Sequence, residues 1–106
     1  MTTIVVAAIL QAVEIEPTMP PSSFIVIGGN EAAAIRAEIA DRGAMGKASG
    51  FGSVRVTAHV GDSRWQTSLF PHKESGGFFL PIKAPVRRAE GLVPGETISA
   101  TIIIEK

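Results

Sequence analysis

Apolar and polar residues alternate with a period of two in the segments 53–60 and 98–104. This alternation is typical of a β-strand that has one buried face. Further apolar runs at 4–15, 24–27, 64–70 and 78–80 end at Gly or Pro residues and also predict strands, with 24–27 expected to be buried on both faces. The pattern therefore predicts about six strands, which are separated by turns and two short helical segments.

The segment 31–42 has the composition of a helix because it is rich in alanine. Its apolar face consists of Ala32, Ile35 and Ile39. Glycine-containing sequences at 61–62 and 75–77 favour tight turns between neighbouring strands. Pro71 and Pro81 are expected to end the strands that precede them. Two successive hairpins of this kind favour a meander.

A second, shorter helix is predicted at 83–90. Pro85 is suited to the first turn of a helix, and Gly91 is suited to its end. In this position the helix buries Val86 and Ala89 and leaves its basic residues largely outside.

The chain length and composition fit one domain over residues 1–106. The chain has 106 residues, of which 45% are apolar, and it contains no cysteine. Packing must therefore hold the fold without disulfides or thiolate metal ligands. Strands that outnumber helices predict a mainly β domain with two helices, built as a small barrel or sandwich.

The apolar start at 4–10 raises the question of a signal peptide or a membrane anchor. No Lys or Arg precedes it, and it is much shorter than the roughly 20 residues of a membrane-spanning helix. We therefore expect no membrane association and a cytoplasmic location.

The formal net charge is zero, which argues against a strongly basic nucleic-acid-binding protein. The charges are nevertheless uneven, because the middle of the chain from Arg42 to Arg88 is basic and both flanks are acidic. Lys83, Arg87 and Arg88 form the best candidate for anion binding, since clustered cations pair with phosphate or carboxylate oxygens. The alternative is that these cations are solvated side chains on a helix face.

Motifs for catalysis, metals and phosphate loops find little support. The glycine-rich segment 43–49 has the wrong glycine spacing for a phosphate-binding loop and lies between a helix and a strand, so it is expected to be a connector. His59 and His72 lack ligand spacing for zinc. Ser68, His72 and Asp62 supply the residue types of a hydrolase triad, but no nucleophile elbow surrounds the serine. We expect no metal, no cofactor and no catalytic residue.

Three ordered blocks of sequence resemble a known family. They are Gly-Phe-Gly-Ser-Val-Arg-Val at 50–56, Trp-Gln-Thr-Ser-Leu-Phe-Pro at 65–71, and the segment 80–92 from Leu-Pro-Ile-Lys to Glu-Gly-Leu. The chain is similar in these blocks to the bacterial family called domain of unknown function 1905. Phe24 stands at an expected aromatic position, whereas Glu96 replaces the Asp that usually follows the last turn glycine.

The resemblance implies a small double-split β-barrel, or pseudobarrel, capped by helices. It implies no activity. The general fold class includes AbrB-like and MazE-like DNA-binding domains, so nucleic-acid binding enters as an alternative by analogy of fold.

The leading hypothesis is a noncatalytic binding module for a small anionic ligand or a protein partner. Its expected binding residues are Trp65, Thr67, Ser68, Lys73, Lys83, Arg87 and Arg88. Trp65 is expected either to fill the core or to stack on a ligand. The alternatives are a nucleic-acid-binding domain and a small enzyme of unknown reaction, and the protein is expected to be a monomer or a homodimer.

Overall fold

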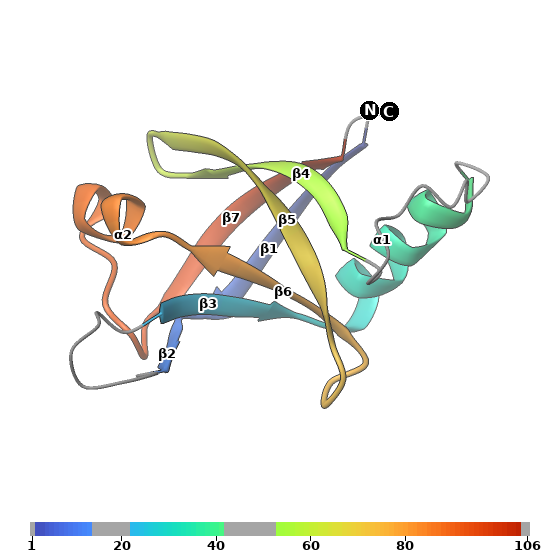
Figure 1. The fold of residues 1–106 in the computed structure, drawn as a ribbon, viewed down its shortest axis with the longest axis horizontal. Helices are drawn as coiled ribbons and strands as arrows, with labels where there is room; N and C mark the ends of the chain where they lie inside the picture. The colour runs from blue at the N-terminus through green and yellow to red at the C-terminus, as the bar shows by residue number, and fades with distance from the viewer. Residues whose placement is uncertain (1, 14–21, 42–52, 105–106) are drawn as a thin grey trace.

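The computed structural model describes residues 2–13, 22–41 and 53–104, which form seven strands and two helices (Figure 1). The strands are β1 (Thr2–Ile9), β2 (Gln11–Val13), β3 (Ser22–Ile27), β4 (Val54–Val60), β5 (Ser63–His72), β6 (Gly77–Ile82) and β7 (Thr97–Ile104). The helices are α1 (Gly29–Asp41) and α2 (Ala84–Glu90). The glycine-rich segment 43–49 lies outside the described residues.

The seven strands form one antiparallel sheet in the order β1-β7-β4-β5-β6-β3-β2. The two edge strands, β1 and β2, follow one another in the sequence and are joined by Leu10. The N–H of Leu10 donates to the carbonyl of Glu96 at 2.9 Å, and the N–H of Gly95 donates to the carbonyl of Leu10 at 2.8 Å. Residues 2–13 therefore pair at both edges of the sheet, and the sheet curls into a small barrel-like fold (Figure 1). The predicted mainly β fold class with two helices is confirmed.

Neighbouring strands of this sheet pair over very different lengths. β4 pairs with β5 along its whole length, whereas β5 pairs with β6 only from Phe70 to His72. β4 likewise pairs with β7 only from Thr57 to His59. The residues of β5 before Phe70 thus have a ladder on one side only, and α2 packs beside this part of the strand (Figure 1).

The core lies inside the curled sheet and is almost entirely aliphatic. Its largest fully buried side chains are Leu10, Ile25, Ile27, Ile35, Leu69, Leu80, Ile102 and Ile104. Ala32 and Ile35 of α1 are buried, and Ile39 packs against the core, as the helical pattern predicts. The α1 helix is also tied to β1, because the Oγ1 of Thr2 donates to the Oε1 of Glu38 at 2.5 Å. No helix in the described part of the chain is long and apolar enough to cross a membrane.

The first two predicted strands differ in detail from the structure. The predicted strand at 4–15 is broken at Leu10, because that side chain turns into the core while its backbone bonds to the turn before β7. In the apolar run 24–27 of β3, only Ile25 and Ile27 are buried, so the prediction of burial on both faces is wrong. Phe24 and Val26 are half-buried because they point to the outer side of the sheet.

The predicted strand ends at the two prolines are also wrong. β5 continues through Pro71, and β6 continues through Pro81. Pro81 pairs with Phe24 of β3 on one side, and its other side faces the gap where β6 no longer pairs with β5. A proline is tolerated there because that side of the strand needs no N–H donor.

Candidate binding site

The α2 helix owes its bounds to local signals that the sequence carries. Pro85 occupies the first turn, and Gly91 adopts a left-handed conformation with φ of 63°. The N–H of Gly91 donates to the carbonyl of Arg88 at 3.3 Å, and that of Leu92 donates to the carbonyl of Arg87 at 2.9 Å. This pair of bonds is the Schellman pattern, which ends a helix at a glycine.

One acidic side chain anchors the end of α2 on the turn between β4 and β5. The Oγ of Ser63 donates to the Oε2 of Glu90 at 2.6 Å. A Cβ atom added to Gly61 would lie only 2.0 Å from the Oε1 of Glu90, so the carboxylate rests directly on this turn. Val86 lies one helical turn earlier and is buried, but Ala89 is exposed, which corrects the prediction for that residue. The anchored face of this short helix therefore runs through Val86 and Glu90.

This anchor holds the end of α2 at the start of β5, where the next inward residue after Ser63 is the half-buried Trp65. The Nε1 of Trp65 is buried and has no hydrogen-bond acceptor among the described residues. The Oγ of Ser23 is also buried and has no partner within the described ranges. Ser23 pairs with Ile82, the last residue of the strand that leads into α2. Buried polar groups without partners are rare and require an explanation. Both of these atoms lie on strands at the α2 end of the barrel.

The basic residues of α2 also have no counter-charge among the described residues. Lys83 and Arg88 are exposed, and Arg87 is half-buried. Within the described ranges, no ion pair joins these three side chains to an acid. Glu90, the acidic residue of α2, accepts from Ser63, and the three cations outnumber the acids in the segment 83–90. Hydrogen-bond donors are therefore in excess at this end of the barrel, and a ligand that fits them must supply acceptors.

The structure separates the remaining expected site residues. Thr67 lies on the same face of β5 as Trp65 and is half-buried. Ser68 points to the outer side of the sheet, opposite Arg55 of β4. Lys73 follows the end of β5, roughly 26 Å of extended chain beyond Trp65. Trp65 and Thr67 therefore share the inner face of β5, whereas Ser68 and Lys73 do not belong to this group.

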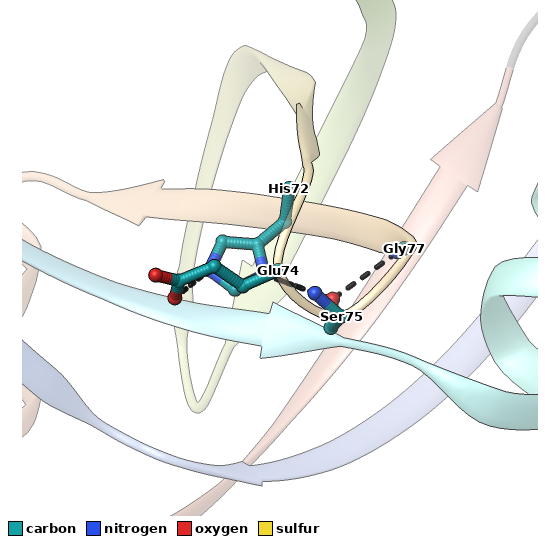
Figure 2. A network of polar contacts seen from close by, with 4 residues as sticks. All are labelled: His72, Glu74, Ser75 and Gly77. Atoms are coloured by element: carbon teal, nitrogen blue, oxygen red, sulfur yellow. Dashed lines mark hydrogen bonds and ion pairs between the residues drawn. The ribbon is translucent and has the colours of Figure 1, made fainter.

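A compact polar network occupies the turn between β5 and β6 (Figure 2). The N–H of Ser75 donates to the Nδ1 of His72 at 3.3 Å, so Nδ1 is an acceptor and the hydroxyl of Ser75 also donates to it, at 2.8 Å. The Oγ of Ser75 in turn accepts from the N–H of Gly77 at 3.1 Å. The other ring nitrogen, Nε2, lies 3.9 Å from the Oε1 of Glu74. The network resembles a serine, histidine and glutamate array within one turn.

This network holds the turn and does not build the suggested hydrolase triad. His72 contacts Ser75, whereas Asp62 lies at the other end of β5, about 30 Å away along the strand. The turn is further tied to α1, because the Nη1 of Arg36 donates to the carbonyl of Gly76 at 2.7 Å. His72 and Ser75 therefore hold the backbone of the turn, and Arg36 attaches the turn to α1.

Sequence reasoning overlooked three residues at the α2 end, namely Ser23, Ser63 and Glu90. Ser63 and Glu90 are 27 positions apart, and nothing local in either segment indicates their contact. Ser23 lies on a strand whose partner, β6, comes more than fifty positions later in the chain. The only local signal is Gly61, whose left-handed φ of 58° belongs to a tight turn and does not reveal what covers it.

Comparison with known proteins supports the family indicated by the three sequence blocks. The model of the family described as domain of unknown function (DUF1905) matches residues 11–102, a range that contains all three blocks. No curated protein matches the chain. The match covers most of the sheet, both helices and the whole candidate site.

Proposed function

Because the chain belongs to the DUF1905 family, whose description states no activity, we propose a function from the geometry at α2. The protein is a noncatalytic binding module that holds an anionic group between α2 and β5. That group is a carboxylate or a phosphate, carried either by a small molecule or by a protein partner. The single observation that carries the proposal is the buried Nε1 of Trp65, which lacks an acceptor among the described residues.

The chemistry of the surrounding side chains selects the charge of the ligand. An indole N–H is a donor only, and the same holds for the ammonium of Lys83 and the guanidinium groups of Arg87 and Arg88. A carboxylate or phosphate accepts several such bonds at once, and guanidinium groups bind these anions in a bidentate geometry. A neutral apolar ligand would leave the N–H of Trp65 as unsatisfied as it is without a ligand.

Trp65 provides a direct reporter, because it is the only tryptophan of the chain. We expect its fluorescence to change on titration with inorganic phosphate, pyrophosphate or succinate, with at least one of these probes reaching saturation. The double substitution Arg87→Gln, Arg88→Gln should weaken that probe about tenfold or more, since each charge-assisted bond stabilises by roughly 1.5–3 kcal/mol. The matched control Lys73→Gln removes a cation from the far end of β5 and should leave the affinity unchanged.

Native mass spectrometry of freshly purified protein separates the two sources of the anionic group. An additional noncovalent mass that the Arg87→Gln, Arg88→Gln variant loses identifies a small molecule. Capture of a synthetic acidic peptide by the wild-type protein, but not by that variant, shows that the anionic group belongs to a protein partner. The Arg87→Gln, Arg88→Gln variant must first show a folded circular dichroism spectrum. If it then binds every probe as tightly as the wild type, the assignment of the anion site to α2 is wrong.

A further inference from the structure

The hydroxyl of Ser23 is a second buried polar group, and an anion bound between α2 and β5 does not by itself explain it. Ser23 is only 5% exposed, and its Oγ has no hydrogen-bond partner in the described part of the chain. The residue lies on the inner side of the sheet, because Ile25 on the same face of β3 is fully buried and Ser23 pairs with the buried Ile82. A hydroxyl that is buried in this way costs free energy unless another group bonds to it.

The strand register places Ser23 in line with the inner face of β5. Counted from the last bonded pair of the β5–β6 ladder, Thr67 and Ile82 each lie three residues further towards α2. Ile82 in turn pairs with Ser23. Ser23, Ile82 and Thr67 thus follow one another across three neighbouring strands, and Trp65 is the next inward residue of β5.

The α2 helix connects the regions that hold the two unpartnered atoms. It begins two residues after the end of β6, and it ends at Glu90, which accepts a hydrogen bond from Ser63 at the start of β5 (Figure 1). A helix of seven residues is about 10 Å long. Its buried residue between these two ends is the apolar Val86. Ser23 and Trp65 therefore lie towards opposite ends of α2, within reach of one small molecule.

We infer, on the basis of the anion site proposed above, that the ligand is a small molecule with an anionic group at the Trp65 end and a hydroxyl or carbonyl oxygen at Ser23. A serine hydroxyl both donates and accepts, so either kind of neutral oxygen satisfies it. A second charge is disfavoured there, because the neighbours of Ser23 on the inner face, Ile25 and Ile82, are apolar. A sugar phosphate and a sugar acid both have this chemistry.

The burial of Ser23 also argues against a protein partner as the carrier of the anionic group. Lys83 and Arg88 are exposed, so a carboxylate on a protein surface reaches them from outside. A protein that docks on the outside of α2 leaves the hydroxyl of Ser23, on the inner side of the sheet, as unsatisfied as before. Only a ligand that enters beneath α2 satisfies both Ser23 and Trp65.

Isothermal titration calorimetry with two matched pairs of probes tests this inference. Ribose 5-phosphate is compared with pentyl phosphate, and gluconate is compared with hexanoate. The members of each pair share the anionic group and the number of carbon atoms but differ in their hydroxyl groups. The wild type should bind the hydroxylated member of one pair about tenfold more tightly, because a plain chain leaves Ser23 without a partner. The pair that shows this preference identifies the anionic group as a phosphate or a carboxylate.

Two variants separate the two ends of the ligand. Ser23→Ala should abolish the preference within the pair, and it should leave the urea midpoint unchanged or raised, since it removes a buried hydroxyl without a partner. Arg87→Gln with Arg88→Gln should instead weaken both members of the pair by the same factor and keep the preference. The matched control Ser68→Ala removes a hydroxyl from the outer side of β5 and should change neither affinity nor preference.

Three results would overturn the inference. The first is equal affinity of the wild type for the two members of each pair. The second is a preference that Ser23→Ala retains together with a lowered urea midpoint, which would show that the hydroxyl stabilises the fold through a buried water molecule. The third is capture of the acidic peptide when none of the four small probes binds. The anion site at α2 survives each of these results as long as Arg87→Gln with Arg88→Gln weakens whatever probe is bound.

Discussion

The two ends of β5 differ in how completely their polar groups are satisfied. At the β6 end, His72, Ser75 and the carbonyl of Gly76 all have partners, and Arg36 of α1 supplies one of them. At the α2 end, the indole N–H of Trp65 is buried without an acceptor in the described part of the chain. The contrast teaches that a cluster of reactive residue types is not by itself a site. Satisfied groups stabilise the fold, whereas a buried donor without a partner requires a separate explanation, and the proposed anion site offers one.

The largest expected effect concerns the β6 end of β5, where Gly77 packs closely against the backbone of β3. Gly77→Ala would place a Cβ atom 2.0 Å from the carbonyl oxygen of Ile27, and a backbone atom cannot move aside as a side chain can. We expect the free energy of unfolding to fall by about 3 kcal/mol, measured by urea denaturation. The matched control is Gly28→Ala, where nothing lies within 4 Å of the added Cβ, and its effect should stay within about 0.5 kcal/mol. Equal effects of the two substitutions would show that β6 does not pack closely on β3 at this point.

An intermediate effect is expected from the hydroxyl that organises the turn. Ser75→Ala removes the acceptor of the Gly77 N–H and the donor to His72. Because the turn is exposed and water replaces part of the loss, the free energy of unfolding should fall by about 1 kcal/mol. Ser99→Ala on the exposed face of β7 is the control and should change stability by less than about 0.5 kcal/mol. The affinity for the anionic probe at α2 should be the same in both variants. A loss of that affinity in Ser75→Ala alone would show that the turn after β5 influences the proposed site at its other end.

The smallest effect on stability is expected at the unsatisfied end. Trp65→Phe keeps an aromatic ring but removes an N–H that has no acceptor among the described residues. The unfolding free energy should change by less than about 1 kcal/mol, since the smaller ring loses some packing while the cost of the buried donor disappears. The affinity for the anionic probe should nevertheless fall, which calorimetry measures without the tryptophan signal. A large loss of stability with unchanged affinity would make Trp65 a purely structural residue.

Much of the fold follows from local patterns in the chain. The alternation in β4 and β7, the alanine-rich α1, and the Pro and Gly signals around α2 each predict an element close to the one observed. The break at Leu10 was not predictable in this way. The sequence there remains apolar and strand-like, and the break depends on hydrogen bonds to residues 95 and 96.

The candidate sites show the same difference between local sequence patterns and tertiary contacts. Local spacing along the chain already indicates which face of a strand or helix each residue occupies, because side chains alternate along a strand and recur with helical spacing. Only the tertiary structure decided which of them meet. The contacts of Ser63 with Glu90 and of Arg36 with Gly76 join residues 27 and 40 positions apart, and the rings around Phe79 come from three strands. Such contacts depend on how the sheet curls and where strand pairing ends, and the sequence of a single strand does not determine either feature.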